Sequence, residues 1–333
     1  MKTTKLLFLL LITTHFSCSS QTKKINGVSF VASRDSISNQ HINPVLKAQS
    51  NYVALMPYSF IRNIEIPKIE FNNNREWFGE TENGLLQYAK EFKKVGVKIM
   101  VKPHLWLRRG GFTENLKPTS EESWKILEDS YKVYILTYAK AAQELNADLL
   151  CIGTELEQFV MNRPTFWQQL IKEIRAVYKG KLTYAANWDE YKRVSFWGDL
   201  DFIGIDAYFP LSDKKSPTIA EYELGWKPHK EEILSIQKKF NKPVMFTEFG
   251  YRSVDFNGKE PWDSNRIEGG VNLEAQANAL QAIHNQFWKE DWFAGGFIWK
   301  WFHRHNTVGG EKNNRFTPQN KPAEELIRKL YGL

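Results

Sequence analysis

The sequence has only two cysteines among its 333 residues, Cys18 and Cys151. Two thiols are too few for a disulfide framework or for a zinc site built on cysteine, so the sequence excludes both classes of protein. Beyond the first twenty residues, no apolar run is long enough to cross a bilayer, which excludes a polytopic membrane protein. The chain also lacks a glycine-rich phosphate-binding loop, and no glycine-rich turn follows its first expected strand.

Basic residues are not concentrated in any one segment. Lysine and arginine total 45 against 38 acidic residues, and pairs such as Lys214-Lys215 are scattered. A nucleic-acid interface needs a clustered basic footprint, so we expect no nucleic-acid partner. Aromatic residues, in contrast, are abundant, with 12 Trp, 13 Tyr and 22 Phe. This is more than a core usually needs, and flat rings are suited to binding the faces of sugars or bases.

The N-terminus has the pattern of an export signal. Two lysines precede an apolar run over 6–16 that is too short for a comfortable permanent span. The run ends at Ser17-Cys18, a small residue before a cysteine, which resembles a bacterial lipobox. We therefore expect a signal peptide at 1–17, lipidation of Cys18, a tether at 18–24, and a protein held at the cell envelope, in the periplasm or at the outer membrane. An ordinary signal peptide cut nearby is the alternative, and it also implies export.

Apolar segments of β type alternate with helical patterns along the rest of the chain. Strands are expected over 27–31, 52–56, 97–101, 148–152, 182–186, 202–206, 243–247 and 295–299. Helices are expected near 44–49 and over 85–94, 122–145, 166–177, 190–196, 229–240, 273–287 and 322–330. Nearly continuous apolar strands suit a parallel sheet buried on both faces. Eight strands alternating with helices predict an α/β fold, a single-domain (β/α)₈ or TIM barrel over 25–333, and a doubly wound open sheet is the alternative.

Glutamates directly follow the fourth and seventh expected strands, at Glu155 and Glu248. The ends of barrel strands meet at one face, where active sites form, so these two carboxyl groups could face each other. Carboxyl groups about 5–5.5 Å apart suit retaining glycoside hydrolysis, in which one is the acid/base and the other the nucleophile. Glu157 is a rival for Glu155. Each glutamate alone could instead cap a helix or pair with an arginine.

These residues and their order resemble clan A of the glycoside hydrolases, and within it family 113, whose known activity is mainly endo-β-1,4-mannanase. The resemblance covers about 25–333 and is carried by VKPHLW at 101–106, GTEL at 153–156, FIGIDAY at 202–208, TEFGY at 247–251 and FIW at 297–299. It implies a double displacement on a β-linked glycan, above all β-mannan, with Glu155 as acid/base and Glu248 as nucleophile. The clan usually has Asn before the acid/base, where it binds the sugar 2-hydroxyl. This chain has Thr154, which can still form a hydrogen bond.

The resemblance also implies two aromatic site residues. Tyr208 would hydrogen-bond the nucleophile, and Trp299 would form a platform beneath the sugar to be cleaved. Other residues after strands could reach sugar hydroxyls or stack on sugar rings, namely His104, Trp106, Asn187, Trp188 and Asp206. Packing in the core is the alternative for each of these residues, and capping of the next turn is the alternative for Asp206.

The remaining candidate groups have simpler interpretations. His303 and His305 could share a face and bind a metal, but the proposed chemistry needs none, so we expect no metal and no cofactor. Cys151 lies in an apolar run and is expected to be a buried, inert thiol. We expect a monomer whose partners are an oligo- or polysaccharide and, through its lipid anchor, a membrane. A glycan-binding lipoprotein without turnover and a hydrolase of another β-glycan are the alternatives.

Overall fold

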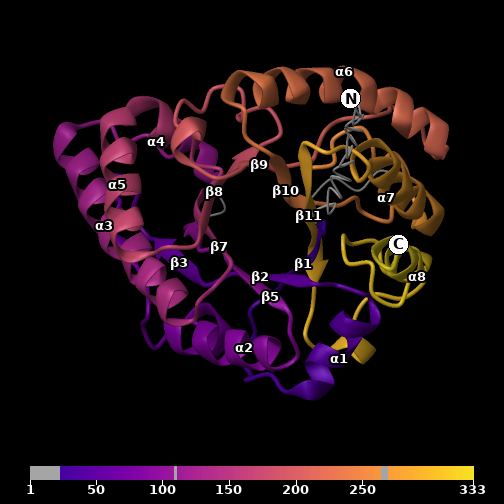
Figure 1. The fold of residues 1–333 in the computed structure, drawn as a ribbon, viewed down its shortest axis with the longest axis horizontal. Coiled ribbons are helices and arrows are strands. Elements are labelled where there is room, and N and C mark those ends of the chain that lie inside the picture. The colour runs from indigo at the N-terminus through magenta and orange to yellow at the C-terminus, as the bar shows by residue number, and fades with distance from the viewer. Residues whose placement is uncertain (1–22, 109–110, 264–268) are drawn as a thin grey trace, which may run out of the picture.

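Eight parallel strands close into a barrel in the computed structural model, which describes residues 23–108, 111–263 and 269–333 (Figure 1). Neighbouring strands around the barrel follow the chain order, and the last strand pairs with the first. The predicted TIM barrel is therefore confirmed. Its strands are β1 (Ile25–Phe30), β2 (Tyr52–Leu55), β5 (Lys98–Val101), β7 (Leu149–Thr154), β8 (Lys181–Asn187), β9 (Ile203–Asp206), β10 (Val244–Phe249) and β11 (Phe293–Trp301).

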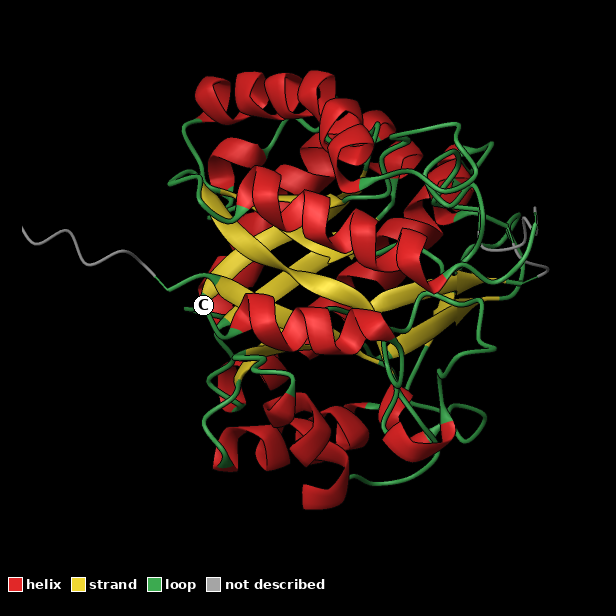
Figure 2. Cartoon of the chain, turned by 90° about the vertical axis from the view of Figure 1, so that its right-hand side faces the viewer, coloured by secondary structure: helices red, strands yellow, loops and turns green. Residues whose placement is uncertain are grey.

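Helices surround the barrel on its outside (Figures 1 and 2). They are α1 (Asn39–Lys47), α2 (Glu82–Lys94), α3 (Glu121–Glu144), α4 (Glu157–Asn162), α5 (Pro164–Val177), α6 (Ile219–Phe240), α7 (Leu273–Phe287) and α8 (Pro322–Tyr331). Helix α3 has an N-cap, because the Ser120 hydroxyl accepts a hydrogen bond from the Ser123 amide. Helix α6 begins at Ile219 rather than 229 and continues through Pro228.

The helix expected over 190–196 does not form. The segment between β8 and β9 consists of turns and a short 3₁₀ helix at Trp197–Asp199. The indole of Trp197 donates to the carbonyl of Tyr191, at 2.9 Å, which occupies an acceptor that an α-helix would use. Trp197 and Phe196 are both buried, so packing of this segment prevails over its helical pattern.

A small second sheet, not predicted from the sequence, extends from the carboxyl end of the barrel. It contains β3 (Tyr58–Ile61), β4 (Ile69–Glu70) and β6 (His104–Leu107), in the order β4-β3-β6. Strands β3 and β6 are parallel, with Tyr58 opposite His104 and Phe60 opposite Trp106. The sheet therefore places residues of the second and third βα loops side by side at one edge of the barrel mouth.

The barrel interior is filled by side chains and not by solvent. One compact cluster of buried residues contains Ile25, Ala54, Met100, Leu149, Cys151, Ala185, Met245 and Phe297. Cys151 is thus a buried free thiol, as predicted, and burial raises its pKa to about 11. Six of the twelve tryptophans are core residues: Trp124, Trp167, Trp197, Trp226, Trp288 and Trp301. Much of the aromatic excess therefore serves packing between the barrel and its helices.

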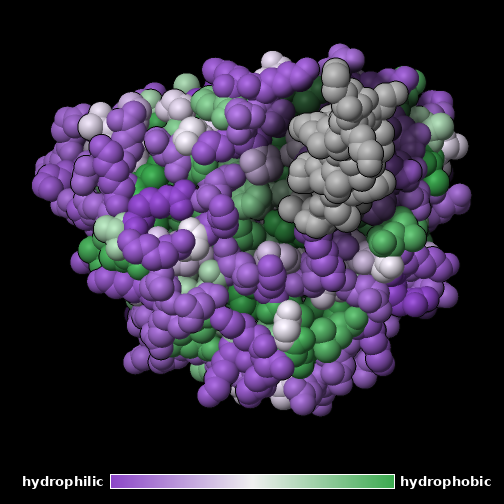
Figure 3. Space-filling model, in the orientation of Figure 1, coloured by the Kyte–Doolittle hydropathy of each residue, from purple (hydrophilic) through white to green (hydrophobic). Residues whose placement is uncertain are grey.

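The outer surface is mainly hydrophilic along the ring of helices (Figure 3). In the part of the chain that the structure describes, no helix is both long and apolar enough to cross a membrane. The predicted signal peptide, the lipidation site Cys18 and most of the tether lie outside the described residues.

Candidate active site

Glu155 leaves the end of β7 through a local break in strand pairing. The register between β7 and β8 shifts between Cys151 and Thr154. Glu155 has a φ of 50°, in the left-handed region, and its amide donates to the Ala185 carbonyl at 2.8 Å. The next amide, that of Leu156, donates to the Tyr184 hydroxyl at 2.6 Å. These bonds hold the backbone on both sides of Glu155 in a conformation that an L-residue adopts only when its surroundings impose it.

Glycine at position 153 permits close packing beneath this turn. A Cβ there would lie 2.8 Å from the Tyr131 hydroxyl and 2.9 Å from the Tyr184 ring. Both rings are fully buried. The glycine therefore lets two aromatic side chains support the strand end that carries Glu155.

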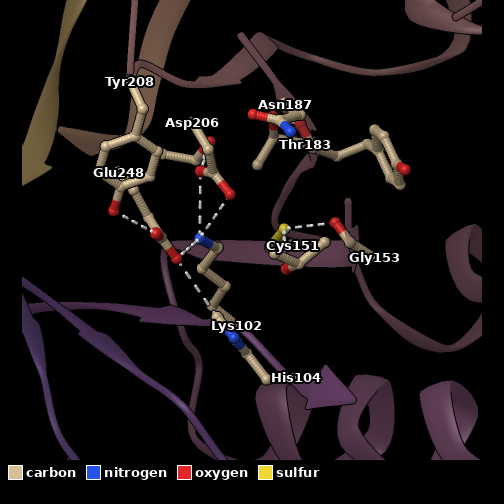
Figure 4. A network of polar contacts seen from close by, with 12 residues as sticks. Lys102, His104, Cys151, Gly153, Thr183, Asn187, Asp206, Tyr208 and Glu248 are labelled. Atoms are coloured by element: carbon tan, nitrogen blue, oxygen red, sulfur yellow. Dashed lines mark hydrogen bonds and ion pairs between the residues drawn. The ribbon is translucent and has the colours of Figure 1, made fainter. Parts of the chain in front are cut away.

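Glu248 also follows an irregularity in its strand. The pairing of β10 with β9 shifts between Phe246 and Glu248, so that Glu248 lies opposite Asp206. The Tyr208 hydroxyl donates to its Oε2 at 2.7 Å, and Lys102 Nζ contacts its Oε1 (Figure 4). His104 Nε2 lies 3.7 Å from the same Oε1. An ammonium and a phenol donor therefore both contact this carboxylate and fix its orientation.

Lys102 is a site residue that our sequence reasoning missed. It follows β5 and lies two residues beyond Met100, which points into the barrel. Its side chain is fully buried between Asp206, 3.2 Å away, and Glu248 (Figure 4). Burial lowers the pKa of Lys102, but the charges of Asp206 and Glu248 outweigh burial and raise it above its usual value. The signal that could have revealed it was a lysine directly after an apolar barrel strand.

Asp206 does not face the cavity, contrary to our expectation that it binds a sugar hydroxyl. It is fully buried, accepts hydrogen bonds from Lys102 and, at 2.7 Å, from the Thr247 hydroxyl, and is absent from the cavity lining. Burial and the charge of Glu248 raise its pKa to about 7. A charged carboxylate inside a barrel needs a buried cation, and Lys102 supplies it to Asp206.

Asn187 and Trp188 do not line the cavity. The Asn187 amide group donates to Glu114 at 3.2 Å and accepts from the Trp188 backbone at 2.8 Å. Trp188 stacks on Trp262, with ring centroids 5.0 Å apart. Since Trp262 does line the cavity, Trp188 supports a wall that it does not itself form.

A cavity of about 410 Å³ contains both glutamates. Four other predicted site residues line it: Thr154, His104, Trp106 and Trp299. Its walls also include aromatic residues that the sequence did not single out, namely Tyr58, Phe112 and Trp262. His104 and Trp299 lie nearly parallel, with an interplanar angle of 11°. Flat apolar walls around two carboxyl groups are an arrangement that suits a sugar ring better than a fully polar ligand.

The two glutamates have different surroundings. Burial, and then the negative charges of Asp206 and Glu248, raise the pKa of Glu155 well above its usual range. Glu155 therefore favours the protonated form, whereas Glu248 has an ammonium and a hydroxyl donor on its oxygens. Pairs of carboxyl groups held in opposite protonation states are how one site supplies both an acid and a nucleophile. The rival Glu157 instead pairs with Arg193, at 2.5 Å, and does not line the cavity.

Comparison with known proteins agrees with this geometry. The model of Glycoside Hydrolase Family 113 matches residues 32–321. The chain belongs to this family. It is therefore a glycoside hydrolase, and its substrate is a carbohydrate. No curated protein sequence matches it.

Solved structures with the same fold include members of family 113. A structure described as a complex of a GH113 β-1,4-mannanase is 22% identical, with a TM-score of 0.79 over 93% of this chain and 99% of the other. The GH113 β-mannanase from Alicyclobacillus acidocaldarius is also 22% identical, with a TM-score of 0.78 over 93% and 97%. A β-glucuronidase from Faecalibacterium prausnitzii, 15% identical, has a TM-score of 0.58 over 93% of this chain and 49% of its own. At these identities, the likeness shows a shared fold.

Two histidines of this family 113 chain were considered as metal ligands from the sequence. His303 Nε2 lies 3.5 Å from Asp35, whereas His305 Nε2 lies 2.6 Å from Glu324. They therefore face different carboxylates. Within residues 23–108, 111–263 and 269–333, no group of three or more His, Cys, Asp or Glu side chains is arranged to hold a metal ion.

Proposed function

We propose that the chain is a retaining endo-β-1,4-mannanase in which Glu155 is the acid/base and Glu248 the nucleophile. One observation carries the proposal: both glutamates line a single aromatic-walled cavity, where burial favours the protonated form of Glu155 and an ammonium and a hydroxyl donor contact Glu248. In the first step, a Glu248 oxygen attacks the anomeric carbon while the bond to the leaving sugar breaks. The electron pair goes to the glycosidic oxygen, which takes the proton of Glu155.

The second step regenerates the enzyme. Glu155, now a carboxylate, takes a proton from water, and the water oxygen attacks the anomeric carbon. The ester to Glu248 breaks and its carboxylate is restored. Lys102 and Tyr208 contact different oxygens of Glu248, so they can orient it before attack and stabilise it as a leaving group afterwards.

Two observations support a mannan substrate and endo action. The similar family 113 structures are named β-1,4-mannanases, and Thr154 lines the cavity beside Glu155, where a hydroxyl can meet the sugar 2-hydroxyl. A second cavity, of about 600 Å³, shares the walls Tyr58, Trp106 and Trp299 with the first. Two adjoining cavities provide room for more than one sugar unit, as cleavage within a chain requires.

Product release by the chain from Ser19 onward tests this proposal. The panel is mannan, glucomannan, cellulose, xylan and chitin oligosaccharides. We expect short mannosides from the unmodified protein and none from E248A, whereas azide should restore turnover of an activated glycoside by E248A with inverted product. E155A should retain activity on activated leaving groups far better than on natural glycosides. E157A is the matched control, because Glu157 faces Arg193 outside the cavity. Loss of turnover in E157A but not in E155A would contradict the assignment.

We also propose that the protein is exported and anchored by a lipid on Cys18, with residues 1–17 as its signal peptide. The support is the sequence pattern at the N-terminus. Expression of the full chain in a bacterium with radiolabelled palmitate should label the protein, and C18A should abolish the label. Labelling that survives in C18A would contradict the proposed anchor.

A further inference from the structure

The second cavity has an unusual electrostatic lining. It is bounded by Trp299, Phe302 and Phe316, among others, and by two cations, Lys300 and Arg315. Among the residues that the structure describes, no aspartate or glutamate lines it, so neither Glu155 nor Glu248 contributes to it. The described lining therefore combines aromatic walls with two basic side chains, beside the cavity that contains the two glutamates.

Lys300 follows Trp299 on β11. Its ammonium lies 5.0 Å from the centroid of the Trp299 ring and 5.5 Å from that of Phe302. In the described part of the chain, it forms no hydrogen bond or ion pair. Burial lowers its pKa, the charge of Glu248 opposes burial, and Arg315 lowers the pKa further.

The protein supplies polar partners to two other buried lysines. Lys102 lies between two carboxylates, whereas Lys321 donates to two neutral groups, the Ser253 hydroxyl and the Arg315 carbonyl. Lys300 differs, because in the described part of the chain its ammonium lies over two ring faces and forms no hydrogen bond or ion pair. A cation–π contact balances only part of the desolvation of an ammonium, so Lys300 is poised for an anion that the protein does not provide.

We propose that this second cavity binds a sugar unit carrying an anionic group, a uronate carboxylate or a sulfate ester, and that the preferred substrate is an acidic β-glycan. Aromatic faces would pack against the sugar ring, and Lys300, with Arg315 in the same lining, would meet the anion. This inference rests on the proposed function.

Matched substrates test the inference. β-1,4-mannohexaose is compared with the same oligosaccharide carrying one mannose oxidised at C6 to the uronate, and with one carrying a 6-sulfate. The measured quantity is the ratio of kcat/KM for each acidic substrate to that for the neutral one. We expect a ratio above one for the unmodified protein and a fall on the order of tenfold in K300M, as for the loss of a charge-assisted hydrogen bond. K300R should retain most of the preference.

Lys312 supplies the matched control. It is exposed, lies in the loop after β11 and does not line the cavity. K312M removes the same charge from the same loop and should keep the ratio of the unmodified protein. If K300M fails to fold by circular dichroism, R315Q at the exposed Arg315 gives the second test, with a fall in the same ratio expected.

The outcomes separate the two proposals. Preference for the uronate alone or the sulfate alone identifies the anion, and both support the inference. Cleavage of all three substrates at equal rates, with no change in K300M, overturns the inference and leaves the proposed function intact. Cleavage of none overturns the proposed function. Calorimetric binding of the same three ligands then decides the inference: tighter binding of an acidic ligand that K300M loses supports it, and equal binding overturns it.

Discussion

Replacing Lys102 with methionine would leave the carboxylates of Asp206 and Glu248 without the cation that lies between them. Lys102 is fully buried, lies 3.2 Å from Asp206 and contacts Glu248. Removing one partner of a buried ion pair destabilises a protein by about 3–5 kcal/mol. Asp206, whose pKa is already about 7, can take up a proton in K102M and offset part of this loss. We therefore expect K102M to be less stable by about 3 kcal/mol at neutral pH, near the lower limit of that range.

The pH dependence follows from the direction of the pKa shift. Lys102 lowers the pKa of Asp206, so its removal raises that pKa further. A carboxyl group with a raised pKa in the folded state stabilises the fold at low pH and loses this contribution as pH rises through that value. The deficit of K102M should therefore grow with pH. Turnover should fall by about 10- to 100-fold, the size expected when a charged carboxylate loses one strong hydrogen bond.

Urea unfolding of K102M between pH 5 and 9 and steady-state kinetics provide the test. K98M is the matched control, since Lys98 begins the strand that Lys102 follows but is exposed, with an ion pair to Asp148 at 3.6 Å and a cation–π contact with Tyr52. Its stability should change by less than about 1 kcal/mol. In K102M/D206N, one negative charge is also removed, and stability should partly return. If K102M unfolds like the unmodified protein, or if the double variant is no more stable than K102M, the counter-ion reasoning is refuted.

Three further predictions concern the groups around the glutamates. E155Q lacks the proton donor and should be inactive on natural glycosides. Because the pKa of Glu155 is raised, its contribution to the stability of the unmodified protein is lost as pH rises, so E155Q should be the more stable protein at pH 9. Equal urea midpoints at pH 9 would contradict this. Y208F removes the donor to Glu248 Oε2 and should lower kcat by about 10- to 100-fold with little change in melting temperature, measured by kinetics and calorimetry. Burial raises the pKa of Glu190 to about 8, so the unmodified protein should lose stability as pH rises from 5 to 9, by up to about 1.4 kcal/mol per pH unit. E190Q should not show this loss. If the free energy of unfolding in urea falls with pH equally in both proteins, Glu190 is not its source.

The strand pattern predicted the barrel because parallel strands buried on both faces have nearly continuous apolar runs. Each of the eight expected strands overlaps one that forms, and the residues after the fourth and seventh carry the two glutamates into one cavity. The helix expected over 190–196 was wrong, because a tertiary hydrogen bond from Trp197 competes for a backbone carbonyl. Local periodicity does not contain that information.

The partners of buried charges were harder to predict than their positions. Asp206 was recognised as following a strand, but its partner Lys102 is 104 residues away. Alternation along a strand indicates which side chains point inward, but not which one meets another across the barrel. The walls Tyr58, Phe112 and Trp262 come from loops and the small second sheet, whose paths no periodic pattern encodes.

Lys102 and Lys300 both lie beside the active site but have different surroundings. Lys102 supports the position of Glu248, whereas Lys300 is placed to recognise a substrate. Lys102 is neutralised in the free protein, so the orientation it gives Glu248 exists before any sugar arrives. Among the described residues, the ammonium of Lys300 lies over two aromatic faces and forms no ion pair, so a close charge partner for it depends on what enters the cavity. A preorganised nucleophile lowers the barrier for every substrate, whereas an uncompensated cation favours only those that bring an anion. The reaction at the two glutamates can therefore stay the same while Lys300, beside Trp299, determines which glycans are preferred.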